Sequence, residues 1–221
     1  MTDAIINVNG DSVQMLDIML LTTVLTLLPS LVVMMTSFTR YIVCFSFLRT
    51  AMGTQQTPPN MVLVGMAIIL TLFTMTPTVN SVREEALDPY TAGEITQEEF
   101  FERAQGPLKE FMLRNTELST VRLYCDMSGV DAPETMEEAG ELSMLVIMPA
   151  FVTTELKTAF EIGFLLYIPF MLIDVIVSST LMSMGMIMLP PSMISTPFKI
   201  LLFILLDGWQ LLFSSLVGGV H

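Results

Sequence analysis

Apolar and polar positions divide this chain of 221 residues into long hydrophobic runs and one polar interval. Residues 18–39 and residues 60–80 contain no charged side chain. At about 1.5 Å per helical residue, either run could cross a hydrocarbon layer about 30 Å thick. Residues 53–59, with the sequence GTQQTPP, lie between the runs and have the composition of a turn. We therefore expect an antiparallel hydrophobic hairpin over residues 13–80, after a polar segment at residues 1–12.

The first run contains a proline and leads directly into a basic residue. Pro29 predicts a kink, because proline cannot donate the backbone hydrogen bond of a helix interior. We expect the helix to continue through Arg40 to about Ala51, since the intervening YIVCFSFL is apolar. Two interpretations of Arg40 are open: its long side chain snorkels towards a headgroup region, or it pairs with an acid on another helix.

Residues 81–141 form the polar interval and hold most of the charge. The whole chain is 52% hydrophobic and 14% charged, which is typical of integral or membrane-associated proteins. The interval carries 15 acidic and 5 basic side chains, and so contributes −10 to the net charge of −13. This pattern predicts an acidic, water-facing insert. Because such a surface repels nucleic acid and lacks the basic patch that binds it, no nucleic-acid partner is expected.

Two helices are expected in the insert. Thr96 and Glu99 have the spacing of a capping box, which predicts a helix beginning at TQEEFFERAQG. Residues 108–127 predict a second helix, on which Glu110 and Arg114 are spaced for an i,i+4 ion pair. The insert is short and has few large apolar groups. We therefore expect packing on its own helices or on a neighbouring subunit to stabilise it.

Residues 142–189 are mostly apolar, yet they carry four charges. These are Glu155, Lys157, Glu161 and Asp174. The longest uncharged run before the last of them, residues 162–173, is only twelve residues long. That length favours a helix packed against protein over a free-standing span, and Pro169 predicts a kink in it. Residues 190–221 follow as a Pro-Pro turn and one C-terminal hydrophobic helix, whose apolar run is interrupted by the charge of Asp207.

Isolated charges among apolar helices are costly, so each should have a partner. Lys157 and Glu161 share a helix face and could pair within the helix, whereas Glu155 lies roughly opposite Lys157. Asp174 and Asp207 have no evident local partner, so partners from other helices or subunits are expected. We favour structural contacts of this kind, between subunits or within a helix, over a proton relay. The candidate set is Arg40, Arg49, Glu155, Lys157, Glu161, Asp174, Lys199 and Asp207.

Methionine makes up 20 of the 221 residues, and four of these methionines alternate around a glycine. Met182, Met184, Met186 and Met188 would scatter around a helix, but in an extended loop they would line one side. Gly185 permits a bend, and flexible thioethers adapt to many shapes. In one chain the segment is only an apolar loop, whereas several copies around an axis could form a deformable seal.

Catalytic and metal-binding patterns do not emerge from the sequence. Cys44 and Cys125 lie in an apolar and a polar segment, and we expect two free thiols. The single histidine is the terminal His221, so the Cys and His ligands of a typical metal site are missing. No nucleophile–base pair or phosphate-binding loop is present. We expect a protein that is not an enzyme and has no cofactor.

Four strings carry a family resemblance. They are SFTRYIVCFSFLRTAMGTQQTPPN (37–60), ELKTAFEIGFLLYIPFMLIDVIV (155–177), MGMIMLPP (184–191) and PFKILLFILLDGWQLL (197–212). These strings closely resemble the FliP family, the P subunit of the bacterial flagellar type III export gate, which is called SctR in injectisomes. The resemblance covers nearly the whole chain, and the acidic insert is its least distinctive part.

The resemblance implies an all-α fold in which two hydrophobic helical hairpins with an acidic insert assemble side by side into a helical ring. It implies five copies together with FliQ and FliR subunits around a narrow pore, with FlhB and FlhA as further partners. Unfolded flagellar proteins pass through this pore. The methionine gasket of the family corresponds to Met184, Met186, Ile187 and Met188, where Ile187 replaces the middle of three consecutive methionines.

The leading interpretation is a pore-forming structural subunit of the flagellar export gate, in the bacterial inner membrane as a multi-pass protein within the basal body. Arg40, Arg49 and Lys199 lie near the two short loops, so the positive-inside rule places the acidic insert on the periplasmic side. One alternative is the homologous injectisome subunit. Another, of a different class, is an ion- or proton-conducting secondary transporter that uses Glu161, Asp174 and Asp207.

Overall fold

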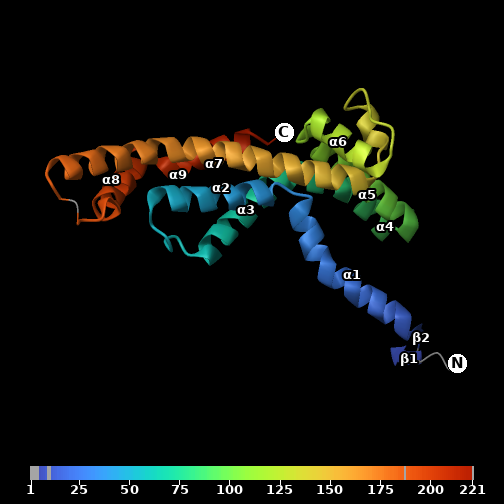
Figure 1. Ribbon diagram of the computed structural model, residues 1–221. Coiled ribbons are helices and arrows are strands. Elements are labelled where there is room, and N and C mark those ends of the chain that lie inside the picture. Colours follow the sequence, from blue (N-terminus) through green and yellow to red (C-terminus); the bar gives the residue numbers. More distant parts are fainter. Residues whose placement is uncertain (1–4, 9–10, 187, 221) are drawn as a thin grey trace.

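Helices account for nearly all of the regular structure in the computed structural model, which describes residues 5–8, 11–186 and 188–220. The expected all-α class is confirmed, with one short exception in the described part of the chain. Strands β1 (Ile5–Val8) and β2 (Asp11–Gln14) pair antiparallel just before α1 (Met15–Met34). In Figure 1, α1 projects away from the long body formed by the other helices.

Helix α1 and helix α2 (Phe38–Met52) are separate, so the expected continuous helix through Arg40 is wrong. The chain leaves the helical path at residues 35–37. There the Thr36 hydroxyl accepts a hydrogen bond from the first backbone N–H of α2 (3.4 Å), and the Ser37 and Thr74 hydroxyls are hydrogen-bonded at 2.8 Å. Hydroxyl side chains that bond the backbone locally compete with helical hydrogen bonds, and this competition explains the break.

Helix α3 (Asn60–Val82) returns alongside α2 after the turn at residues 53–59 (Figure 1). Gly53 ends α2 in the left-handed conformation, with φ of 74°, which a residue with a Cβ adopts only under strain. Arg49 donates a hydrogen bond to the Asn60 side-chain oxygen across the turn. Beyond α3 the chain stays helical through the π-helix η1 (Arg83–Leu87) and α4 (Asp88–Thr91).

The insert contains α5 (Gln97–Arg114), α6 (Leu118–Ser128) and the 3-10 helix η2 (Glu138–Glu141). The capping box at the start of α5 is confirmed: Thr96 accepts from the Glu99 backbone N–H (3.3 Å), and the Glu99 carboxylate accepts from the Thr96 backbone N–H (2.7 Å). The Glu110–Arg114 ion pair is also confirmed.

The expected second helix over residues 108–127 is divided between two helices. Helix α5 runs through Pro107 to Arg114, and α6 begins only at Leu118. At the division the Asn115 side-chain amide donates to the Phe111 carbonyl (2.9 Å), and the Thr116 hydroxyl donates to the Met112 carbonyl (2.6 Å). These side-chain donors satisfy carbonyl groups at the end of α5 and so allow the chain to turn there.

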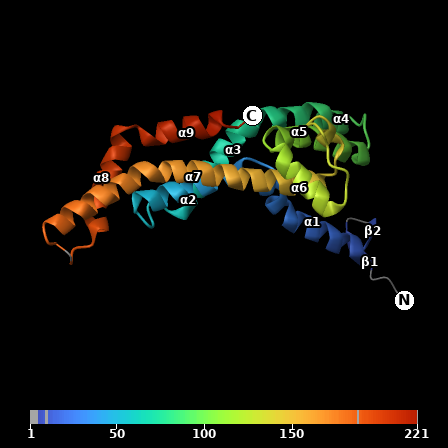
Figure 2. The same cartoon turned by 45° about the horizontal axis from the view of Figure 1, so that its top comes forward.

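The longest element is α7 (Met144–Ser183), a single helix of 40 residues that continues through Pro149 and Pro169. Helices α8 (Pro191–Leu205) and α9 (Gly208–Gly218) follow, with a 65° bend between them. The single hydrophobic helix expected after the Pro-Pro turn is thus divided in two, at a residue, Asp207, that has φ of 48°. Figures 1 and 2 show α7 extending along the body, with the insert near its start and the α7–α8 turn at the opposite end.

In the part of the chain that the structure describes, the core consists of two apolar clusters. One lies among α2, α3, α7, α8 and α9, and includes Tyr41, Phe45, Leu63 and Leu216. The other joins the insert to α7 and includes Met112, Val121 and Phe151, all at most 1% exposed. The insert thus packs on its own chain, which is one of the two supports expected for it.

Among the residues that the structure describes, two helices are long and apolar enough to cross a membrane: the continuous helix Asn60–Thr91, and α7. Helices α8 and α9 would be a third if the bent pair is one span. Only 22% and 11% of their most apolar windows are buried within the chain. Most of their apolar surface therefore faces outward. Contiguous exposed apolar surface of this kind marks contact with lipid or with other proteins.

Candidate functional site

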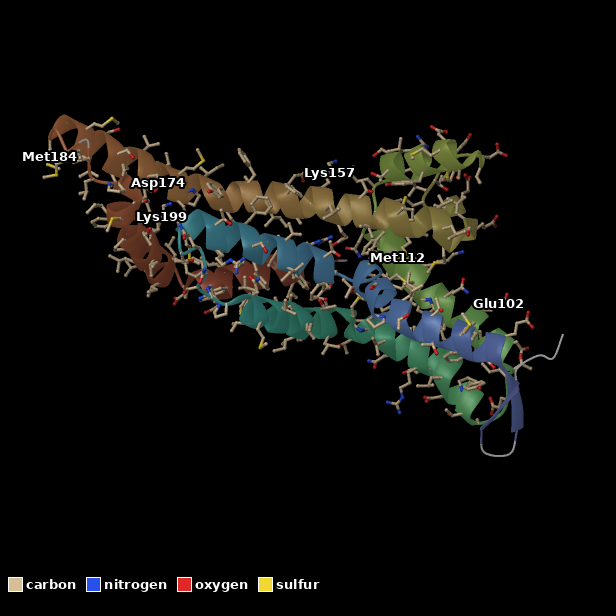
Figure 3. All side chains as sticks on the ribbon, turned by 60° about the horizontal axis from the view of Figure 1, so that its bottom comes forward. Glu102, Met112, Lys157, Asp174, Met184 and Lys199 are labelled. Carbon is tan, nitrogen blue, oxygen red and sulfur yellow. The ribbon has the colours of Figure 1, made fainter. Side chains whose placement is uncertain are left out.

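The turn between α7 and α8 presents exposed methionines at the tip of the molecule. Met184, Met186 and Met188 have 57%, 50% and 98% of their surface exposed, whereas Ile187 lies outside the described residues. Figure 3 shows Met184 at the free end of α7, far from Glu102 in the insert. Of the remaining candidate residues, six belong to ion pairs or polar contacts between elements, and Glu161 and Asp207 are exposed.

A Schellman motif shapes the methionine turn. The Gly185 backbone N–H donates to the Met182 carbonyl (3.0 Å), and the Met186 N–H donates to the Leu181 carbonyl (3.0 Å). Gly185 has φ of 75°, so the expected bend at this glycine is confirmed. Met182 still lies in the last turn of α7, and only the later methionines occupy the turn itself. The Leu181 and Met182 carbonyls at the end of α7 are thus satisfied, while the Met184 and Met186 thioethers remain exposed.

Arg40 and Glu155 form a buried ion pair between α2 and α7. The two residues are 3% and 1% exposed, and the Arg40 Nε donates to Glu155 Oε2 at 2.8 Å. The Nη2 of Arg40 donates to Glu155 Oε1, and its Nη1 donates to the Gly219 carbonyl just beyond α9. Of the two interpretations of Arg40, the paired charge is the one found. One guanidinium therefore connects α2, α7 and the end of α9.

Lys199 and Asp174 form a second pair near the α7–α8 end (Figure 3). The Lys199 Nζ donates to Asp174 Oδ2 at 2.6 Å and to the Ala51 carbonyl at 3.0 Å. Lys199 is 5% exposed, but the Asp174 side chain is 41% exposed. This ammonium group therefore joins α8 to α7 and to the end of α2, close behind the methionine turn.

A third pair fastens the insert to α7. Lys157 Nζ donates to both carboxylate oxygens of Glu117, at 2.7 and 2.8 Å. This hydrogen bond lowers the pKa of the Glu117 carboxyl, because it stabilises the ionised form. The Glu117 backbone N–H also donates to the Thr154 hydroxyl (3.4 Å), and the Tyr124 and Thr153 hydroxyls are hydrogen-bonded at 2.8 Å. The partner of Lys157 is thus Glu117 rather than Glu161.

Three candidate residues lie outside these three ion pairs: Arg49, Glu161 and Asp207. Arg49 supports the α2–α3 turn, and Glu161 is exposed on α7. Asp207 is exposed and precedes α9 with φ of 48°, a left-handed conformation that is uncommon for a residue other than glycine. Its side chain does not cap α9.

Glu117 was not among the sequence candidates, and neither was the Gly219 carbonyl. No local signal could have identified them, since Glu117 lies 40 positions from Lys157 and Gly219 lies 179 positions from Arg40. Among the residues that the structure describes, no group of three His, Cys, Asp or Glu side chains could hold a metal ion. Both cysteines are free and buried, as expected.

Comparison with known proteins identifies related sequences over most of the chain. Residues 21–216 match the model of the FliP family. Flagellar biosynthetic protein FliP of Aquifex aeolicus is 46% identical over 94% of this chain and 87% of its own length. The protein of the same name from Bacillus subtilis is 46% identical over 90% of this chain and 89% of its own length. The protein of this name from Pectobacterium carotovorum is 49% identical over 92% of this chain and 78% of its own length.

Proposed function

Because this chain belongs to the FliP family, we propose that it is a structural, pore-forming subunit of the flagellar type III export gate. In this role, copies of the chain pack side by side, and their methionine turns together close a central channel for unfolded flagellar proteins. The observation that carries the proposal is the position of Met184, Met186 and Met188. They are at least half exposed at the tip of a 40-residue helix.

The three ion pairs between elements support a structural role for the charges on α2, α7 and α8. Asp174 and Glu155 are each paired with a base, so neither is a free acid that could load a proton from a channel. A transporter that uses Glu161, Asp174 and Asp207 would require Asp174 to be released from Lys199. Glu161 and Asp207 are exposed, which leaves them available for contacts between subunits.

The proposed assembly contains five copies of this chain with FliQ and FliR, in contact with FlhB and FlhA, in the bacterial inner membrane. The outward-facing apolar surface of the helices Asn60–Thr91 and α7 supports burial in such a complex. We assign it to the flagellum rather than to an injectisome because the relatives above are named flagellar biosynthetic proteins. Loss of motility on deletion of the gene, with restoration by the intact gene, tests this assignment.

The seal is tested by replacing Met184, Met186 and Met188 together with alanine. We expect cells carrying this variant to leak ions while they still export flagellar proteins, because a narrower side chain leaves a gap but does not block passage. Met61 is 86% exposed on α3 and does not belong to the methionine turn, and Met61→Ala is the matched control that should remain ion-tight. An ion-tight triple variant with normal export would show that these methionines do not form the seal.

A further inference from the structure

The hairpin that precedes α1 is a sheet of only two strands in the described part of the chain. Strands β1 and β2 pair antiparallel, with Asn7 opposite Ser12. Figures 1 and 2 show the hairpin at the far end of α1, away from the body formed by the other helices. A two-stranded hairpin is only marginally stable in water by itself, and further strands stabilise it. The two outer edges of the hairpin are therefore the surface to be explained.

The chemistry of these edges identifies the kind of partner that fits them. In an antiparallel pair, every second residue directs its backbone N–H and C=O groups to the other strand, and the residues between direct theirs outward. Each outer edge thus presents donors and acceptors at the spacing of a strand. A hydrocarbon chain has neither, so lipid cannot satisfy them. Another strand of polypeptide satisfies both kinds of group.

A second copy of this chain provides such a strand in the correct direction. Copies that pack side by side in the same orientation present equivalent strands in the same direction. The β2 of one copy then meets the β1 of the next, and these two strands run antiparallel, as they do within the hairpin. Each copy has one edge of each kind, so successive copies satisfy one another's edges without a strand from a different protein.

The spacing of packed helices matches the width of the hairpin. Strand β2 ends at Gln14 and α1 begins at Met15, so each hairpin continues directly into its helix. Strands lie about 4.8 Å apart, and one hairpin therefore adds about 9.6 Å to a continuous sheet. Helices pack about 8–10 Å apart. Copies whose α1 helices pack side by side would thus hold their hairpins at the repeat of a single sheet.

Helix α1 has the surface that such packing requires. Residues 18–34 contain no charged side chain, and Met19, Leu27 and Leu31 are 64%, 54% and 43% exposed. A helix that is apolar on most of its sides is typical of one buried among other helices or in lipid. Lipid would cover α1 equally well, but it would leave the strand edges beyond the helix unpaired. The hairpin edges, and not the helix, therefore decide for a second copy.

We propose that the hairpins of neighbouring copies join into one continuous antiparallel sheet, in which β2 of each copy is hydrogen-bonded to β1 of the next. The proposal rests on the side-by-side assembly proposed above and specifies one contact between its copies. The sheet lies at the α1 end of the assembly, far from the methionine turn (Figure 1).

Disulfide formation between two cysteine variants tests this contact. Asn7→Cys and Ser12→Cys are produced with different affinity tags in one cell that also makes the other flagellar proteins, and the membranes are oxidised. Opposite residues of paired strands share a face of the sheet, so Ser12→Cys of one copy lies beside Asn7→Cys of the next. We expect a disulfide-linked dimer that carries both tags.

Each variant produced alone is the first control. Equivalent residues of successive copies are two strands apart, about 9.6 Å, which exceeds the Cα separation of about 7 Å that a disulfide can bridge. Neither variant alone should therefore give a dimer. Ser12→Cys produced with Gln56→Cys, in the exposed α2–α3 turn, is the control for random collision. The natural Cys44 and Cys125 are buried.

The mass of the detergent-extracted complex separates this proposal from the proposed function. A complex with several copies but no doubly tagged dimer would overturn the continuous sheet and leave the export role intact. A disulfide from Asn7→Cys alone would also overturn it, because β1 would then pair with β1. A complex with a single copy would overturn both proposals. If either variant fails to assemble, Ile5→Cys with Gln14→Cys, the next register pair on the same face, gives the same comparison.

Discussion

At the scale of single residues, the Arg40–Glu155 pair is the contact whose loss should be most damaging. Both side chains are almost fully buried, so removing one partner leaves an uncompensated charge in an apolar interior. We predict that Arg40→Met or Glu155→Leu alone destabilises the chain by about 3–5 kcal/mol. Guanidinium- or heat-induced unfolding of the purified protein in detergent, followed by circular dichroism, measures this effect.

The double variant Arg40→Met with Glu155→Leu distinguishes a lost charge pair from lost packing. It should recover much of the stability, because neither charge then remains buried without its partner. Glu110 and Arg114 provide the surface control: their side chains are both 62% exposed, and breaking that pair should change stability by no more than about 0.5 kcal/mol. A double variant as unstable as the sum of the single variants would contradict the interpretation.

A glycine on α7 gives a second prediction at this scale. A Cβ on Gly163 would lie 2.5 Å from the Phe47 ring, whereas a Cβ on Gly65 in α3 would meet no atom within 4 Å. Gly163→Ala should therefore destabilise the chain by about 1–3 kcal/mol through overpacking. Gly65→Ala should stabilise it by up to about 1 kcal/mol, since alanine favours a helix more than glycine does. Equal effects in the same unfolding measurement would refute the close contact of α2 with α7.

At the scale of secondary-structure elements, local signals were reliable where neighbouring residues alone determine the geometry. The capping box of Thr96 and Glu99 and the bend at Gly185 were both predictable from sequence. Each depends on residues within a few positions of one another. Such contacts form irrespective of how the rest of the chain folds.

Two helix boundaries and one ion-pair partner were predicted wrongly. In each case hydrogen bonds to the backbone, or contacts with distant residues, determine the structure. The break at residues 35–37 involves a hydrogen bond between Ser37 and Thr74, which no local pattern reveals. The composition of residues 108–127 is helical throughout, yet Asn115 and Thr116 end α5 by bonding its carbonyls. The partner of Lys157 was missed because Glu117 comes from the insert, which the sequence does not place against α7.

The capping box also makes the stability of α5 depend on pH. Hydrogen bonding from Thr96 lowers the pKa of the Glu99 carboxyl in the folded chain below its unfolded value of about 4.3. The folded state thus binds the proton less tightly than the unfolded state does. The stabilisation is fully present above pH of about 4.3 and is lost as the pH falls through the lower, folded pKa.

Glu99→Gln provides the test of this pH dependence. Glutamine can still accept from the Thr96 backbone N–H but does not titrate. We therefore predict that the difference in stability between the original chain and Glu99→Gln shrinks as the pH is lowered through this range. Amide hydrogen exchange of the first turn of α5, compared at neutral and acidic pH, measures it. A difference that does not change with pH would exclude Glu99 as the responsible group.

At the scale of the whole molecule, charge and apolar surface are separated along its length. The acidic insert occupies one end, and the methionine turn occupies the other (Figures 1 and 3). The fold class could be predicted from the apolar runs, but the long exposed faces of the helices Asn60–Thr91 and α7 are not explained by a single chain. Their apolar surface is complete only with lipid or neighbouring subunits, which one sequence does not specify.

This separation predicts how the chain is oriented in the inner membrane. Arg49 and Lys199 lie near the α2–α3 and α7–α8 turns, so by the positive-inside rule those turns face the cytoplasm and the insert faces the periplasm. Glu102→Cys places a thiol on the exposed surface of the insert, and Gln56→Cys places one in the exposed α2–α3 turn. The natural Cys44 and Cys125 are buried, so labelling of the folded chain should report the introduced thiol.

A membrane-impermeant maleimide should therefore label Glu102→Cys in spheroplasts, and Gln56→Cys only after the inner membrane is opened. The chain without an added cysteine is the control for background, and labelling of both variants after lysis shows that both thiols are accessible. Labelling of Gln56→Cys in intact spheroplasts would reverse the orientation. Because the methionine turn lies at the same end as the α2–α3 turn, that reversal would also place the methionine turn on the periplasmic side (Figure 1).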